Sequence, residues 1–131
     1  MTKKELSQLY YLNNEIKQQK RKLAELENAA TKTNQPLTGM PSAGNTNDKV
    51  GAYAAEIADL RALIAINIQK CLLEQKRLER YIQGIDDSLT RQIFSLRYIS
   101  CMSWNQVANC VGGGNTEGSV KMIHGRYLNS H

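Results

Sequence analysis

The sequence predicts an all-α protein, in which a long antiparallel coiled-coil helical hairpin precedes a small three-helix unit. Apolar residues recur at three- and four-residue spacing over two long stretches, residues 4–30 and 50–83. The chain is 41% hydrophobic but only 6% aromatic, which suits helices packed through Leu, Ile and Ala better than a large β core. Both prolines lie between the two stretches, where a connection is expected.

Residues 4–30 are expected to form one helix with an apolar row along one side. Gln19 interrupts this row, and most of the charged residues lie off it. A row sustained over about three heptads favours a coiled-coil partner helix. The row consists of Leu9, Leu12, Ile16, Leu23, Leu26 and Ala30.

Residues 31–48 are predicted to be a loop, because Gly, Ser, Thr, Asn and both prolines dominate the stretch. The loop is longer than most connections that lack secondary structure, which favours a functional or mobile segment. The sequence leaves its role open.

Residues 50–83 are expected to form the second arm of the hairpin. Its main row consists of Ile57, Leu60, Ile64, Ile68, Cys71, Leu78 and Ile82. A broad apolar surface can hold more than one neighbour, so we expect self-association as a homodimer with two-fold symmetry. The residues that widen the row are Leu63, Ile66, Leu72 and Leu73.

The predicted domain boundary separates the hairpin, residues 1–84, from a helix-turn-helix DNA-binding unit, residues 85–131. Gly84 suits the end of the long helix, and Asp87 or Ser88 can cap the next one. That helix is expected over residues 88–99. Its apolar face consists of Leu89, Ile93, Leu96 and Ile99.

A second short helix is expected to begin at Ser103, which forms a capping box with Gln106. Three glycines follow it, and glycine adopts turn conformations that bulkier residues resist. The helix packs through one apolar face. This face consists of Val107, Ala108 and Val111.

The last helix begins after the glycines, with Asn115 or Thr116 as its cap. Two short helices around a tight turn give the outline of a helix-turn-helix, whose second helix can enter a major groove. Generic helical hairpins share this outline. The inward row of the last helix consists of Val120, Ile123, Tyr127 and Leu128.

If that row faces inward, Lys121 and Arg126 lie outward, where they can contact phosphates or guanine edges. Glu117 can accept a hydrogen bond from a cytosine amino group. Gly118 and Gly125 each cost about 1 kcal/mol of helix stability relative to Ala, which close approach to a DNA backbone would offset. The alternative is that these cationic side chains are ordinary solvent-exposed residues with no binding role.

The charge balance of the predicted DNA-binding unit argues against tight DNA binding by a single copy. The whole chain carries a formal net charge of +5, but residues 86–131 contain four Lys or Arg and three Asp or Glu, a net of 4 − 3 = +1. Phosphate neutralisation supplies much of DNA affinity. One copy of the unit should therefore bind weakly, and a dimer or larger complex should bind better.

No nucleophile, base and acid come together in the sequence as a catalytic set, so a non-enzymatic protein without cofactor or small-molecule substrate is expected. His124 lies among the inward residues of the last helix and is expected to have a packing or capping role. A zinc site of Cys101, Cys110 and His124 is the alternative, but no C-x-x-C pair supports it. No apolar run reaches the roughly 20 residues of a membrane helix, and no signal-type segment opens the chain. We expect a cytoplasmic protein that binds no membrane.

The order of motifs from Thr90 onward resembles region 4 of sigma-70-type transcription factors. TRQIFSLRY resembles the first helix of that module, SWNQVA its S-x-x-E-I-A helix with Gln106 in place of Glu, and SVKMIHGRYL its recognition helix. The full chain is similar to small, uncharacterised proteins of Gram-positive phages and prophages. Their resemblance extends to GMPSAGNTNDKVGAYAAEIADL and GGGNTEGSVK.

The resemblance implies a transcription regulator in a bacterial host cell, with double-stranded DNA and RNA polymerase as expected partners. No segment resembles the region that melts the −10 element, so a complete sigma factor is not expected. The rival interpretation is a packaging protein, similar to a small terminase subunit, or a protein-only adaptor. The DNA contacts that the resemblance implies are Thr116, Glu117, Gly118, Ser119, Lys121, Met122 and, as a flanking phosphate contact, Arg126.

Overall fold

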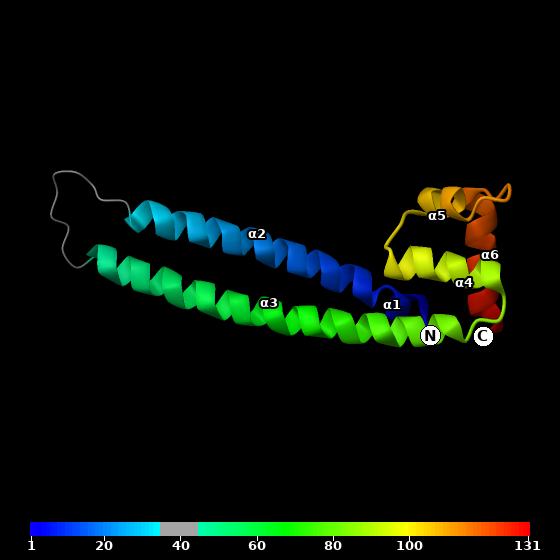
Figure 1. The fold of residues 1–131 in the computed structure, drawn as a ribbon, viewed down its shortest axis with the longest axis horizontal. Helices are drawn as coiled ribbons and strands as arrows, with labels where there is room; N and C mark the ends of the chain where they lie inside the picture. Colours follow the sequence, from blue (N-terminus) through cyan, green and yellow to red (C-terminus); the bar gives the residue numbers. More distant parts are fainter. Residues whose placement is uncertain (35–44) are drawn as a thin grey trace. The chain divides into compact units, whose positions relative to one another are not determined.

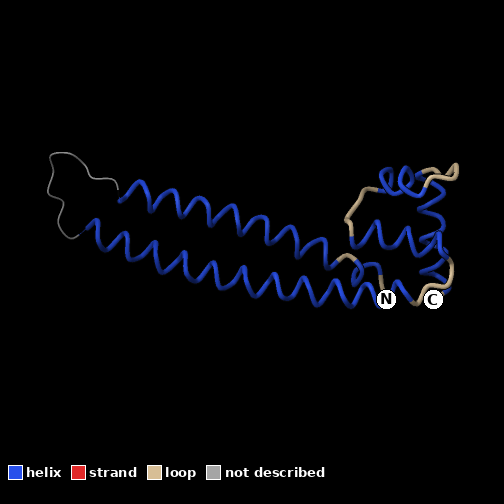
Figure 2. The backbone as a smooth tube through the Cα atoms, in the orientation of Figure 1, coloured by secondary structure: helices blue, strands red, loops and turns tan. Residues whose placement is uncertain are grey.

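The computed structural model describes residues 1–34 and 45–131, and in these residues every regular element is a helix (Figures 1 and 2). The predicted all-α class is confirmed. The elements are α1 (Lys3–Leu6), α2 (Gln8–Asn34), α3 (Asn45–Gln83), α4 (Ser88–Phe94), the π-helix η1 (Ser95–Ile99), α5 (Trp104–Val111) and α6 (Glu117–Ser130).

The two long helices extend further than the sequence predicted. Helix α2 continues to Asn34 and α3 begins at Asn45, so both ends of the predicted 31–48 loop are helical. Thr31 is accommodated because its hydroxyl donates to the Glu27 carbonyl, 2.8 Å away, within the helix. The rest of the predicted loop, residues 35–44, lies outside the described residues, and its role stays open.

The predicted single helix over residues 4–30 is broken at Ser7, between α1 and α2. The Ser7 hydroxyl donates to the Lys3 carbonyl at 2.9 Å, and this back-bonding commonly bends a helix. At the other end of α1, Thr2 and Glu5 form a capping box, in which each side chain accepts from the other residue's backbone N–H. The short helix is therefore fixed at both ends.

Contacts group the chain into two compact units, residues 14–69 and residues 1–13 with 70–131. The predicted boundary after residue 84 stays a prediction. Within the first of these units, α2 and α3 pair in antiparallel fashion. Arg61 and Glu27 form an ion pair at 2.7 Å between them, but both are exposed, so the pair contributes little stability.

A polar pair interrupts the apolar seam of this helical pair. Asn67 is buried, and its side-chain amide donates to Gln19 at 2.9 Å. The predicted row placed Ile68 in the seam, but Ile68 is 39% exposed and Asn67 takes its place. The exchange satisfies Gln19, which would otherwise lack a partner inside the seam.

In the second unit, α4, α5 and α6 each pack against the other two. Their shared core contains Ile93 from α4, Val107 and Ala108 from α5, and Val120 from α6. An aromatic cluster adjoins this core, with Phe94 in contact with four rings at centroid distances of 5.0–6.5 Å. These rings belong to Tyr81, Tyr98, His124 and Tyr127.

The predicted capping box at the start of α5 is confirmed. Ser103 Oγ accepts from the Gln106 N–H at 3.2 Å, and Gln106 Oε1 accepts from the Ser103 N–H at 3.0 Å. The glycine turn then runs through three consecutive residues with positive φ, at 60°, 63° and 78° for Gly112, Gly113 and Gly114. Other residues resist this conformation, so the triple glycine is required by the turn.

We predict that Gly113→Ala lowers the free energy of unfolding by about 1 kcal/mol, because Ala is strained at this positive φ. The nearest atom to an added Cβ, Asn115 Nδ2, is 3.7 Å away, so backbone strain rather than a clash sets the effect. Urea unfolding followed by the fluorescence of Trp104, the single tryptophan, measures it.

Gly118→Ala is the matched control. Gly118 is helical and an added Cβ meets only Thr116 Oγ1 at 3.9 Å, so this variant should gain about 1 kcal/mol. A loss of stability in Gly118→Ala, or none in Gly113→Ala, would contradict this account of the turn.

Candidate nucleic-acid interface

Helix α6 presents one buried and one exposed side. Val120 and His124 are buried, whereas Glu117, Gly118, Lys121, Met122 and Arg126 are exposed. Met122 is 54% exposed although it is apolar. Five of the seven residues predicted to contact DNA are therefore accessible on α6, and we call them the outer face of α6.

Two of the predicted contact residues hold the start of α6. Thr116 is the N-cap, and its Oγ1 accepts from the Ser119 N–H at 3.2 Å. Ser119 Oγ accepts from the Thr116 N–H at 2.9 Å and lies 3.2 Å from Asn115 Oδ1. Ser119 is half-buried and its hydroxyl is occupied within the protein, so its role in this structure is to fix the helix start.

The charges on the outer face are partly neutralised. Lys121 Nζ and Glu117 Oε1 form an ion pair at 3.0 Å, with both side chains half exposed. A surface pair of this kind is weak and can exchange Glu117 for a phosphate at little cost. Arg126 has no ion pair among those present in the described residues.

Two further arginines of this unit support the fold. Arg91 Nη1 donates to the Ile85 carbonyl at 2.7 Å, and this bond links α4 to the short connection between α3 and α4. Arg97 Nη1 donates to the Met102 carbonyl at 2.9 Å, and its guanidinium lies 4.5 Å from the centre of the Trp104 ring. The sequence-based charge balance counted both arginines alongside Lys121, but their geometry commits them to internal contacts.

His124 is buried, as predicted, and it forms a hydrogen bond with the Tyr98 hydroxyl. Burial lowers the pKa of His124 to about 4, and the nearby charges of Lys3 and Arg97 act in the same direction. Burial also raises the pKa of Tyr98 to about 12. At neutral pH the pair is uncharged, so the Tyr98 hydroxyl can donate to the imidazole Nε2.

The sequence did not predict the π-helix η1, which connects α4 to the turn before α5. The Ser100 N–H bonds to the Ser95 carbonyl five residues earlier, at 3.1 Å, and Cys101 follows with a positive φ of 56°. Such π turns are often found at functional sites. Here η1 carries Arg97 and Tyr98, which position Trp104 and His124 respectively.

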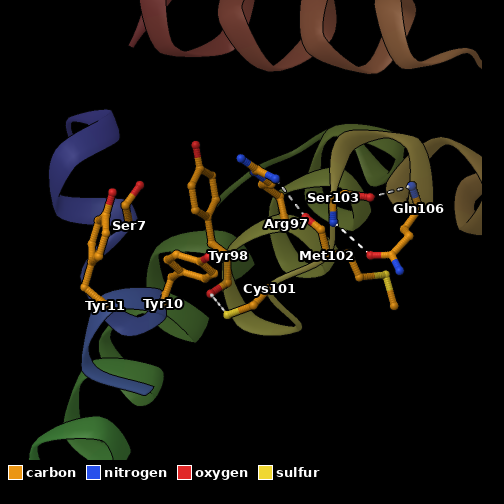
Figure 3. Close-up of a pocket in the computed structure, with 9 residues that line it drawn as sticks. All are labelled: Ser7, Tyr10, Tyr11, Arg97, Tyr98, Cys101, Met102, Ser103 and Gln106. Carbon is orange, nitrogen blue, oxygen red and sulfur yellow. Dashed lines mark hydrogen bonds between the residues drawn. The ribbon is translucent and has the colours of Figure 1, made fainter. Parts of the chain in front are cut away.

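A cavity of about 420 Å³ lies beside η1 (Figure 3). Two exposed tyrosines of α2, Tyr10 and Tyr11, form part of its lining, with ring centroids 5.4 Å apart. Several of its polar groups are bonded within the protein: Arg97 donates to the Met102 carbonyl, and Ser103 and Gln106 bond to each other. We find no converging nucleophile and base in it.

An open groove of about 640 Å³ borders α6. Lys121, His124 and Gly125 of α6 line it together with Trp104 and Lys3. Sequence reasoning did not assign Lys3 to the site, because 118 positions separate it from Lys121 and no local pattern links the two. The capping box of α1 was a visible signal that this segment is ordered.

Comparisons with known proteins identify no relative of this chain, since no family model, curated protein or solved structure matches it. The resemblance to sigma region 4 therefore stays a prediction. Within the described residues, no helix is long and apolar enough to cross a membrane, and no three His, Cys, Asp or Glu side chains gather as metal ligands.

Burial of neutral His124 predicts a pH-dependent stability. In the unfolded state the histidine has a pKa near 6.5, whereas in the folded state its pKa is about 4. Between these two pH values the unfolded state therefore binds a proton that the folded state does not bind. The stabilisation is complete above pH 6.5 and is lost as the pH falls from 6.5 to 4. It amounts to about 3 kcal/mol.

Unfolding free energies of wild type and His124→Gln at pH 7.5, 5.5 and 4 test this linkage. The variant should start less stable but decline less steeply over the acidic range. His131→Gln, which removes the other, exposed histidine, is the control and should keep the wild-type slope. Identical slopes for wild type and His124→Gln would show that His124 does not titrate as described.

Proposed function

We propose that the protein is a DNA-binding transcription regulator of phage or prophage type, with the outer face of α6 as the DNA-reading surface. The observation that carries this proposal is the division of α6 into a buried side, with Val120 and His124, and an accessible side, with Lys121 and Arg126. A helix that enters a major groove needs such an unobstructed side on a rigid support.

The glycines of α6 add support. An added Cβ at Gly118 meets one side-chain atom at 3.9 Å, and at Gly125 it meets nothing within 4 Å. Packing inside the protein therefore gives no reason for two residues that each weaken a helix by about 1 kcal/mol. Close approach of a DNA backbone or base edge to α6 supplies a reason.

The proposed reading mechanism separates positioning from discrimination. Lys121 and Arg126 contact phosphates, with Lys121 released from Glu117 on binding. Glu117 and Met122, at the exposed N-terminal half of α6, face base edges, where a carboxylate accepts from cytosine and an apolar side chain contacts the thymine methyl group. Thr116 and Ser119 hold the helix start.

We predict that Lys121→Ala with Arg126→Ala weakens duplex binding at least tenfold and lowers the slope of log affinity against log salt by about 1.8, which corresponds to two phosphate contacts. A duplex recovered by selection from a random DNA library, labelled for fluorescence anisotropy, provides the measurement.

The control for this pair of substitutions is Lys20→Ala with Arg21→Ala, which removes the same two charges from the exposed side of α2. It should leave the salt slope unchanged. Failure of the selection to recover any duplex, or equal losses in both double variants, would contradict DNA reading by α6. Binding without sequence preference would favour the packaging role.

A homodimer is part of this proposal, because few cations on each outer face imply weak binding by one copy. In the unit of residues 14–69, Leu63 and Ile66 of α3 are 44% and 50% exposed, and an exposed apolar surface of this kind marks an interaction site. An antiparallel second copy would bury the surface under two-fold symmetry.

We predict that Ile66→Lys shifts the protein from dimer to monomer in sedimentation equilibrium, because a charge buried between two apolar helices is unfavourable. Gln18→Lys, on an exposed position of α2, should leave the dimer intact. A monomeric wild type at micromolar concentration would refute the dimer, and DNA binding could still be measured.

A further inference from the structure

The open groove beside α6 brings together residues from three distant parts of the chain, all within the unit of residues 1–13 and 70–131. Lys3 belongs to α1, Trp104 begins α5, and Lys121 and Gly125 belong to α6. Lys121 also belongs to the outer face of α6, so the groove and that face are continuous.

The groove has the chemistry of a phosphate site. Lys3 and Lys121 line it, and none of the described residues that line it is acidic. Lys3 and His124 both line the groove, and the charge of Lys3 contributes to the lowered pKa of the imidazole. The positive charge of the groove comes from the two lysines, of which Lys121 is also ion-paired with Glu117 at 3.0 Å.

Lys3 is held by the local structure of α1. Glu5, the nearest carboxylate in sequence, accepts from the Thr2 N–H at 3.0 Å and therefore serves the capping box. Leu6 is fully buried and anchors the helix to the unit. The backbone of Lys3 is therefore ordered beside the groove, and its ammonium group has no ion-pair partner among the described residues.

The remaining walls suit a sugar–phosphate chain. Trp104 and Leu128 supply apolar surface, Asn129 supplies an amide, and Gly125 leaves its backbone uncovered, with nothing within 4 Å of the position of an added Cβ. An open groove with these walls accommodates a continuous strand better than a small enclosed anion.

We propose that this groove seats the backbone of one DNA strand, with phosphates at Lys3 and Lys121 and deoxyribose against Trp104. The inference rests on the proposed function and deepens it, because it adds the N-terminal segment to the DNA-binding surface. Phosphate contacts fix the register of a recognition helix on the duplex without reading sequence.

The test compares Lys3→Ala with Lys4→Ala in the full-length protein. The two lysines are adjacent and exposed, but only Lys3 lines the groove. With the selected duplex, Lys3→Ala should weaken binding about fivefold and lower the salt slope by about 0.9, the value for one phosphate. Lys4→Ala should retain the wild-type slope.

Gly125→Ala provides an independent test, because the expected loss of duplex binding is accompanied by a gain in stability and so cannot result from misfolding. It should raise the stability of the unit, because Ala favours a helix, and weaken duplex binding, because its methyl group projects into the groove. Duplex addition should also change the fluorescence of Trp104 in the wild type.

The outcomes separate the two proposals. If wild type binds the duplex but Lys3→Ala and Lys4→Ala behave alike, or Gly125→Ala binds as wild type does, the groove is not the strand site and the proposed function stands. If wild type binds no duplex, both proposals fall.

Discussion

The buried side of α6 is the constraint on which the rest of the candidate site depends. Val120 enters the core formed by α4 and α5, and one turn later His124 enters the aromatic cluster and bonds to Tyr98. Two anchors at adjacent turns fix the rotation of a helix about its axis. Burial favours the neutral form of His124, and with both anchors in place Lys121 and Met122 remain exposed.

Features set by neighbouring residues were predictable from the sequence. The capping box of Ser103 and Gln106 needs only residues three positions apart, and the structure contains it. The inward position of Val120 followed from helical spacing, and the glycine turn followed from three residues that tolerate positive φ. These features determined the all-α class and the exposed face of α6, which is most of what the candidate site requires.

Features set by distant partners were not predictable. In the seam, Asn67 takes the position predicted for Ile68 and donates a hydrogen bond to Gln19 of the other helix. The pairing register of the two helices determines which residue faces Gln19. No residue pattern marked the π-helix η1, which carries the buried Tyr98. Lys3 reaches the groove only because α1 packs in the same unit as α6. Each case requires three-dimensional proximity between segments that are far apart in sequence.

The central claim is that the outer face of α6 contacts duplex DNA, and amide chemical-shift mapping by NMR tests it most directly. Gly118 and Gly125 report from α6, and Gly51 of α3 is a built-in reference in the other unit. On titration with the selected duplex, the account predicts that the α6 glycine signals shift or broaden while the Gly51 signal stays in place. A titration in which the duplex binds but leaves both α6 signals unchanged would contradict the account.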